Sequence, residues 1–166
     1  MKIRLAKASE VPTILEIYAD ARAYMRASGN QTQWEGGYPS ETIVCEDLAA
    51  SRLYVVEENG TLLGVFCFFL GEDPTYSYIE GAWPDDLPYG VIHRIAVAKN
   101  AHGRGVASAC FAFAMESTDR LRIDTHADND PMQRALEKNG FVRCGVIYLA
   151  NGDPRYAYQK NAGIES

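Results

Sequence analysis

One segment of the chain restricts its possible folds more than any other: an apolar strand, a short polar loop, and two glycines that open an apolar helix. The pattern predicts a strand over Val91–Ala98 and a helix over Arg104–Thr118, with Gly103 and Gly105 at the junction. Free N–H groups at the start of a helix form an anion site, and glycines leave it open to a ligand. The segment therefore predicts a phosphate-binding turn between a strand and a helix.

Positive charge gathers at this turn, in a chain that is acidic as a whole. The 166 residues include 22 acidic and 16 basic ones, which gives a formal net charge of −6. This balance argues against a general nucleic-acid binder, whose affinity depends on Lys and Arg that neutralise phosphates. Lys99, His102 and Arg104 instead predict one small phosphate-bearing ligand, while the acidic remainder is compatible with a cationic second substrate.

Two other phosphate-binding motifs can be compared with this turn. A Walker loop is excluded, because Gly-Lys followed by Ser or Thr is absent from the sequence. A dinucleotide-binding oxidoreductase domain stays open as an alternative, since Ser108 takes the third glycine position and Asp124 falls where a ribose-binding acid is expected. The residues between the strand and Gly103 count against it, because the first glycine of that motif follows its strand almost at once.

The remaining periodicity predicts one domain over residues 1–166, with a mixed α/β sheet in the order β-α-α-β-β-β-α-β-α-β-β. The predicted strands are Lys2–Lys7, Arg52–Glu57, Leu62–Leu70, Val91–Ala98, Leu121–Thr125, Phe141–Leu149 and Arg155–Gln159. Ser9, Ser40 and Asp130 are expected to cap helices, and Gly140 to follow the end of the last one. Aromatic residues concentrate in the connections Gln31–Pro39 and Gly71–Gly90.

Nothing in the sequence predicts a membrane segment, an exported protein or a metal site. The longest apolar run, Leu62–Leu70, is too short to span a bilayer, and the N-terminus lacks the apolar core of a signal peptide. The four cysteines are not spaced as zinc ligands and are expected to be free thiols in a reducing cytoplasm.

Two motifs in this order resemble those of the Gcn5-related N-acetyltransferases, the GNAT family. The first is His102-Gly103-Arg104-Gly105-Val106-Ala107, where the family has Gln or Arg, two residues, Gly, one residue, and Gly or Ala. The second runs from Asn129, which would start the last helix, to Gly140-Phe141, which would end it. The resemblance covers nearly the whole chain and implies a single-domain acyl-CoA N-acyltransferase fold with splayed fourth and fifth strands.

The resemblance also implies how acetyl-CoA binds. Backbone groups of the fourth strand would hold the pantetheine arm, and N–H groups of the glycine turn would hold the pyrophosphate, while Asn129 would hydrogen-bond the arm. The backbone near Val97 would also polarise the thioester carbonyl. The residues predicted to bind acetyl-CoA are thus Ile95, Ala96, Val97, His102, Gly103, Arg104, Gly105, Val106, Ala107, Ser108 and Asn129.

In this family the acetyl group moves by direct attack of an amine within a ternary complex. The attacking amine must lose a proton, and an alkylammonium has a pKa of about 10. His93 is the first candidate base, with Glu80 as the second, and Tyr148 or Tyr89 could protonate the leaving thiolate. Strict alternation would place His93 on the same face of its strand as Ile95 and Val97.

One departure from the family concerns the usual acid. Many members carry a Tyr in the last helix, four or five positions before the Gly-Phe pair, whereas this chain has Ala135 and Leu136 there. An acyl-CoA sensor without efficient transfer is therefore a second functional hypothesis.

Aromatic side chains are expected to shape the site of the amine acceptor, a small molecule or a peptide. Aromatic faces provide apolar walls and cation–π surfaces for an ammonium group. The predicted acceptor-binding residues are Trp34, Tyr38, Trp83, Tyr89 and His126. The resemblance also implies that a homodimer could form through sheet edges or C-terminal strands.

Overall fold

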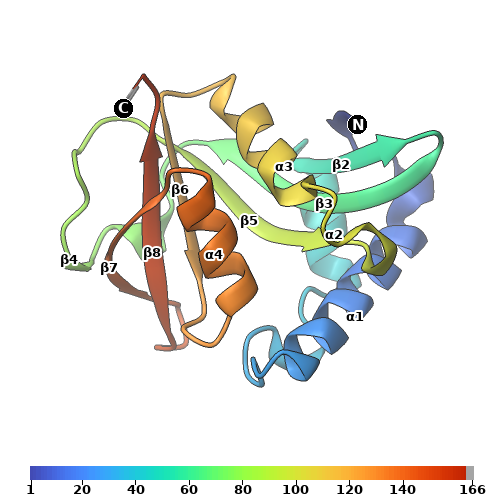
Figure 1. The fold of residues 1–166 in the computed structure, drawn as a ribbon, viewed down its shortest axis with the longest axis horizontal. Helices are drawn as coiled ribbons and strands as arrows, with labels where there is room; N and C mark the ends of the chain where they lie inside the picture. Colours follow the sequence, from blue (N-terminus) through green and yellow to red (C-terminus); the bar gives the residue numbers. More distant parts are fainter. Residues whose placement is uncertain (164–166) are drawn as a thin grey trace.

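The predicted apolar runs form the strands of one sheet, with helices on both of its faces (Figure 1). The computed structural model describes residues 1–163. The strands are β1 (Lys2–Leu5), β2 (Leu53–Glu58), β3 (Thr61–Leu70), β4 (Glu80–Gly81), β5 (Gly90–Val97), β6 (Arg120–Thr125), β7 (Val142–Tyr148) and β8 (Pro154–Asn161). The helices are α1 (Val11–Ala27), α2 (Glu41–Ala49), α3 (Val106–Met115) and α4 (Asp130–Lys138). In the sheet, the strands follow the order β1-β2-β3-β5-β6-β8-β7-β4.

The predicted order of strands and helices is confirmed, with the short strand β4 as an addition within Gly71–Gly90. β4 pairs with β7, and the two backbones approach so closely that a Cβ on Gly145 would collide with the Glu80 carbonyl oxygen. The glycine, at a φ of +156°, makes this edge pairing possible. The segment Gly71–Gly90 contains turn-forming residues and no alternation of apolar and polar residues, so its sequence does not predict such a strand.

The helix caps were predicted less accurately than the helices. Ser40 caps α2 as expected, since its Oγ accepts from the Ile43 N–H at 3.3 Å. The prediction for Ser9 is wrong, because Ser9 lies in a 3-10 turn (Ala8–Glu10) that precedes α1. Asn129 replaces Asp130 as the cap of α4.

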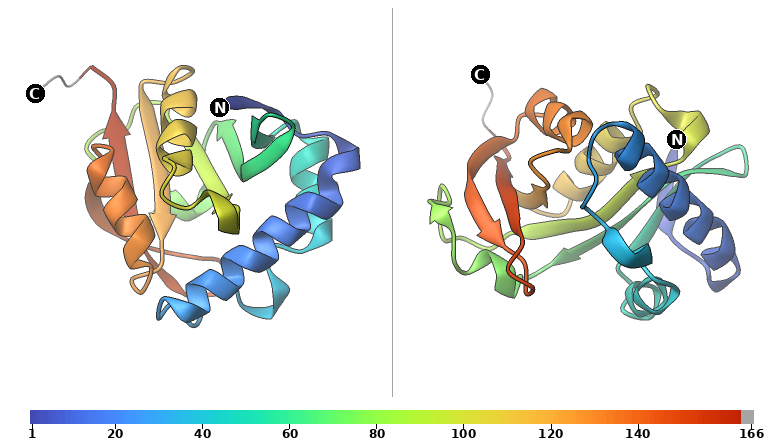
Figure 2. Two further views of the ribbon diagram at one scale, coloured as in Figure 1. Left: turned by 45° about the vertical axis from the view of Figure 1, so that its right-hand side comes forward. Right: turned by 90° about the horizontal axis from the view of Figure 1, so that it is seen from below.

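The two faces of the sheet carry separate apolar cores. Val55 packs in a cluster with α1 and α2, whereas the next residue, Val56, packs in a cluster with α3 and α4. This is the period-two alternation of a strand that is buried on both faces. The two helix pairs thus lie on opposite faces of the sheet, as the views in Figure 2 show.

The sheet opens where β5 and β6 run side by side. These strands are parallel, and only two residue pairs join them: Gly90 with Leu121, and Val91 with Arg122. Beyond Val91 the strands diverge, so the rest of β5 has no strand partner on that edge. The predicted splay between the fourth and fifth strands of the family fold is confirmed here.

A bulge in β5 overturns the predicted alternation. Val65 pairs with Ala96 but Cys67 pairs with His93, so β5 contains one extra residue. Arg94 lies at the bulge with a φ of +50°. Ile95 consequently packs in the same core cluster as Ile92, and the expectation that His93 shares a face with Ile95 is wrong.

Candidate active site

A cleft of about 520 Å³ occupies the opening between β5 and β6. Ile92 and Ile95 line it from the core beneath α3 and α4, while His93 and Arg94 line it from the bulge. Residues from both sides of β5 therefore surround the cleft, which places it within the splay. Two ligands that approach from the two faces of the sheet could meet there.

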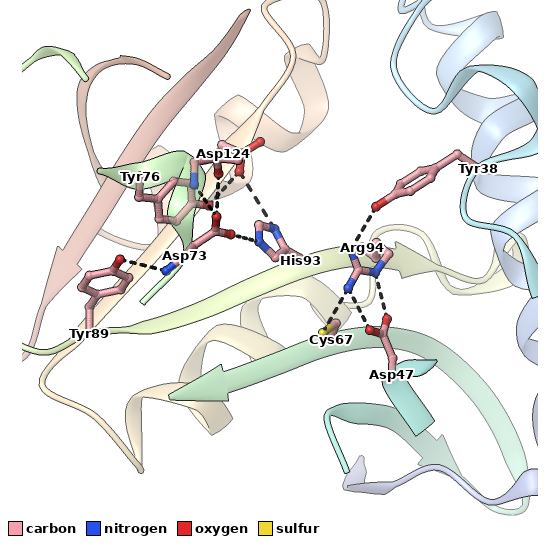
Figure 3. A network of polar contacts seen from close by, with 10 residues as sticks. Tyr38, Asp47, Cys67, Asp73, Tyr76, Tyr89, His93, Arg94 and Asp124 are labelled. Atoms are coloured by element: carbon pink, nitrogen blue, oxygen red, sulfur yellow. Dashed lines mark hydrogen bonds and ion pairs between the residues drawn. The ribbon is translucent and has the colours of Figure 1, made fainter. Parts of the chain in front are cut away.

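His93 lies at this cleft with one ring nitrogen held by a carboxylate. Its Nε2 lies 2.5 Å from Asp73 Oδ2 (Figure 3). Asp73 Oδ1 accepts two hydrogen bonds from Thr75. Burial acts to raise the pKa of Asp73, but the hydrogen bonds from His93 and Thr75 outweigh it and lower this pKa to about 2. An ionised carboxylate can only accept hydrogen bonds, so His93 Nε2 carries the proton that is donated to Asp73. In the neutral ring Nδ1 then carries no proton and can accept a hydrogen bond from a group in the cleft.

A second carboxylate faces that free nitrogen. Asp124 Oδ2 lies 4.0 Å from His93 Nδ1, and it accepts a hydrogen bond from the Tyr76 hydroxyl at 2.7 Å. Tyr76 is 1% exposed, so its hydroxyl fixes the direction of the carboxylate. His93 Nδ1 and Asp124 together present two acceptors to one group in the cleft.

Arg94 forms a separate network that fixes the bulge. Its guanidinium donates twice to Asp47 of α2, at 2.8 Å each, and once to the Tyr38 hydroxyl at 2.9 Å. Burial acts to lower the pKa of Arg94, but the paired Asp47 carboxylate raises it overall. The Tyr18 hydroxyl donates to the Arg94 carbonyl oxygen at 2.8 Å. The bulge is thereby tied to both α1 and α2, and Figure 3 shows Arg94 and His93 directed to different partners.

The glycine turn before α3 is open and rich in donors. Gly103 and Gly105 have φ values of +81° and +76°, and no atom lies within 4 Å of the place of a Cβ on either. Within residues 1–163, the N–H groups of Val106, Ala107 and Ser108 have no backbone or side-chain acceptor. These groups fit the phosphates of an acyl-CoA.

The charge around this turn is smaller than the sequence suggested. Arg104 forms an ion pair with Glu58 on the β2–β3 hairpin. His102 is exposed and stacks on the ring of Tyr24, with centroids 4.4 Å apart. Lys99 is exposed. Backbone N–H groups thus supply most of the anion-binding character of the turn.

The unpaired edge of β5 presents further donors to the opening. The Ala98 N–H donates to the Leu63 carbonyl on β3. Because successive N–H groups of a strand point to opposite edges, the Val97 N–H points away from β3, toward the splay. It is available for a ligand that lies along β5.

Comparison with known proteins settles the family. A model described as "Acetyltransferase (GNAT) family" matches residues 13–141 of this chain. The chain belongs to the GNAT family of acetyltransferases. No curated protein sequence matches it.

Solved GNAT structures share the fold over nearly the whole chain. A GNAT acetyltransferase from Streptococcus agalactiae is 34% identical, covers 96% of this chain and 94% of its own, and has a TM-score of 0.88. A GNAT acetyltransferase from Listeria monocytogenes is 22% identical, with coverages of 96% and 94% and a TM-score of 0.72. AAC(6')-Ib, solved with ribostamycin and coenzyme A, is 17% identical, with coverages of 97% and 93% and a TM-score of 0.67.

Two contacts in this GNAT domain connect the loop after α1 with the segment before α4. The Asn129 Nδ2 donates to Gln33 Oε1 at 3.0 Å, while its Oδ1 caps α4 through the Met132 N–H. His126 Nε2 lies 2.8 Å from Thr32 Oγ1, and the His126 Nδ1 accepts from the Asp128 N–H. Asn129 lines the cleft, but the structure shows its side chain as a helix cap, and its predicted contact with pantetheine stays a prediction.

Only some of the residues that were predicted to bind the acceptor line the cleft. Trp34 and Tyr38 line the cleft. Trp83 and Tyr89 do not, because they lie on either side of the Arg122 guanidinium, each with its ring centroid 4.0 Å away. They stabilise the segment that carries Tyr76, whose carbonyl oxygen accepts from Trp83 Nε1 at 2.9 Å.

The other two catalytic candidates lie outside the cleft. The Tyr148 hydroxyl donates to the exposed Glu80 at 2.5 Å across the β4–β7 pair at the edge of the sheet. This hydrogen bond raises the pKa of Tyr148. In α4, Leu136 is fully buried in the core. This helix contains no tyrosine that could act as the acid instead.

Sequence reasoning missed three cleft residues. The sequence did not identify Asp73 as a site residue, because the residues on either side of it follow neither the period of a strand nor that of a helix. Asp124 was noticed only as the acid of a dinucleotide motif, which is wrong here, since the sheet is mostly antiparallel and the family is GNAT. Arg155 was expected only as the start of a strand, and it lines the cleft while it is 7% exposed.

In the described part of the chain, no helix is both long and apolar enough to span a membrane.

Proposed function

We propose that residues 1–166 form one acetyl-CoA-dependent N-acetyltransferase domain that acts on a primary amine of a small molecule or a peptide. The observation that carries this proposal is the pair His93–Asp73 at the floor of the cleft, with His93 Nδ1 free and facing Asp124. Bound acetyl-CoA would supply an acetyl group activated as a thioester. The open turn before α3 and the free edge of β5 would hold it.

In this proposal the acceptor enters as an ammonium group between His93 Nδ1 and Asp124. His93 takes one proton through Nδ1, while Asp73 stabilises the imidazolium through Nε2. The neutral amine nitrogen then forms a bond to the carbonyl carbon, and the C–S bond breaks with its electron pair on sulfur. The second N–H proton of the attacking nitrogen passes to this thiolate, which leaves the amide and free coenzyme A. The Val97 N–H would donate to the carbonyl oxygen, where negative charge develops.

The leaving sulfur needs no tyrosine in this scheme. A thiol has a pKa of about 8.5, so its thiolate is a tolerable leaving group without a general acid. The buried Leu136 nevertheless favours one alternative, an acyl-CoA sensor without efficient transfer.

The proposal is tested by coenzyme A affinity and by thiol release over a panel of amines. Gly105→Glu places a negative side chain in the open turn, and we expect at least a 10²-fold loss of acetyl-CoA affinity in calorimetry. Gly60→Glu is the matched control, because Gly60 has a φ of +80° and equally open surroundings. Equal affinity in the two variants would contradict the assignment of the turn. Binding without thiol release for any amine would favour the sensor.

A further inference from the structure

Arg155 is a buried cation in the cleft without an anionic partner. It is 7% exposed, and its single hydrogen bond among the described residues runs from Nη1 to the carbonyl oxygen of Pro154 at 2.8 Å. Within residues 1–163, no carboxylate forms an ion pair with it. Arg94, the other arginine that lines the cleft, is half-buried and paired with Asp47. Since an unpaired buried charge is costly, the guanidinium points to an anionic ligand.

A second polar group in the lining of the cleft also lacks a partner. Thr125 lines the cleft at 1% exposure, and its Oγ1 is buried without a hydrogen bond. Buried hydroxyls are nearly always hydrogen-bonded. Thr125 pairs with Tyr156 of β8, so its side chain lies on the face of the ladder opposite to that of Arg155. Only Arg155 therefore presents an unpaired charge to the face that carries Asp124.

The strand register places Arg155 close to the proposed ammonium site. Asp124 pairs with Ala157, and Arg155 lies two residues further along β8, on the same face of the sheet. Diagonal neighbours of this kind are about 7–8 Å apart. The positive charge of Arg155 also contributes, after burial, to a lowered pKa of His126 at the same end of the ladder.

We propose that the acceptor is a small amino carboxylate, such as an α-amino acid, whose carboxylate is bound by Arg155. This inference rests on the proposed function, because the ammonium group of the same molecule occupies the site between His93 and Asp124. The guanidinium provides a planar pair of donors for the carboxylate. A short molecule with both charges would thus pair with Arg155 at one end and with His93 Nδ1 and Asp124 at the other.

The test compares acceptors that share one side chain and differ at the carboxylate. The series is an amino acid, its amide, its decarboxylated amine and the aminophosphonate of the same skeleton, assayed by thiol release. We expect the wild-type kcat/KM to be about 10²-fold higher for the acid than for the amide, as for other buried charged contacts. In Arg155→Gln we expect this preference to be lost through a higher KM for the acid, with a much smaller change in kcat/KM for the decarboxylated amine.

Two further variants keep the test decisive. Arg155→Lys retains the charge, and we expect a partial preference for the acid. Arg143→Gln is the matched control, because Arg143 stacks on the Tyr156 ring away from the cleft, and the preference should stay intact. Calorimetry of the amino acid with the wild type, in the presence of coenzyme A, provides a readout that is independent of turnover and should show binding that Arg155→Gln lacks.

The outcomes separate this inference from the proposed function. Equal transfer to acid, amide and amine by the wild type would overturn the inference and leave the N-acetyltransferase intact. Preference for the phosphonate over the carboxylate would also overturn the assigned class. Absence of transfer to all four acceptors, together with absence of acetyl-CoA binding, would overturn the proposed function itself.

Discussion

A single imidazole lies between two carboxylates in this cleft, and the two contacts have different consequences. Asp73 holds His93 Nε2 at hydrogen-bond distance, whereas Asp124 lies 4.0 Å from Nδ1. The near carboxylate fixes the tautomer, so the acceptor nitrogen faces the cleft. The more distant one leaves space for a donor to reach both acceptors. Asp73 is thus a positioning residue, and Asp124 would contact the amine.

Asp73→Asn is expected to lower kcat at pH 7 by about 10²-fold, since the amide no longer fixes the protonated Nε2 or stabilises an imidazolium. It should also lower the free energy of unfolding. The Asp73 pKa is lowered to about 2 from an ordinary value near 4, which corresponds to roughly 2 kcal/mol of stability above pH 4. This contribution is lost as the pH falls through about 2. Urea titrations of both proteins between pH 7 and pH 2 measure it.

The control for this substitution is Asp153→Asn. Asp153 also lines the cleft, but its side-chain carboxylate accepts a hydrogen bond from Asn151 and none from a histidine among residues 1–163. Its substitution should leave kcat for the decarboxylated amine near the wild-type value. A stability difference between wild type and Asp73→Asn that stays constant down to pH 2 would contradict the role given to the carboxylate.

The element that organises the site is β5, and its bulge is held by contacts from other elements. The extra residue at Arg94 turns His93 toward Asp73 and Asp124, while Ile95 returns to the core. The buried Tyr18 hydroxyl of α1 donates to the Arg94 carbonyl oxygen. The position of the proposed base therefore depends on a hydrogen bond from a residue 76 positions earlier in the chain.

Tyr18→Phe is expected to lower the free energy of unfolding by about 1–2 kcal/mol, because it leaves a buried carbonyl oxygen unsatisfied. It should also lower kcat several-fold through a shift of the bulge, with acetyl-CoA affinity nearly unchanged. Tyr54→Phe is the control: Tyr54 packs on Phe66, and no hydrogen bond of its hydroxyl is present among residues 1–163. Equal effects of the two substitutions on unfolding and kcat would show that the hydroxyl of Tyr18 does not hold the bulge.

Elements with a strong local signal were predictable, and those set by tertiary contacts were not. The strand over Val91–Ala98 and the glycine turn follow from apolar runs and glycine positions. The bulge does not, because Arg94 has no local feature that requires a φ of +50°; its conformation depends on Asp47 and Tyr18, far away in the chain. Asp73 and Arg155 were missed for the same reason, since only the folded chain brings them to the cleft.

On the scale of the whole molecule, the splay divides the sheet into two parts. Two residue pairs join β5 to β6, so backbone pairing contributes little to the connection beyond Val91. The contacts Asn129–Gln33 and His126–Thr32 connect the parts on the far side of the opening. A cleft that must admit two ligands is thereby closed at one end by side-chain hydrogen bonds rather than by strand pairing.

This connection is expected to weaken in mild acid through His126. Burial and the charge of Arg155 lower the pKa of His126 below its ordinary value, although Asp128 and Asp153 act in the opposite direction. A lowered pKa in the folded state means that the neutral ring stabilises the fold above about pH 6.5, and that this contribution is lost as the pH falls below that value. Protonation also removes the Nδ1 acceptor of the Asp128 N–H.

His126→Gln tests this, because glutamine can still donate to Thr32 and does not titrate. We expect the wild type to lose stability relative to the variant between pH 7.5 and pH 5, and we expect the amides of Thr32 and Gln33 to exchange faster in the wild type at the lower pH. Urea unfolding and hydrogen exchange, corrected for the intrinsic pH dependence of exchange, measure the two effects. Parallel stability curves for the two proteins over this range would show that the two parts of the sheet are connected independently of the charge on His126.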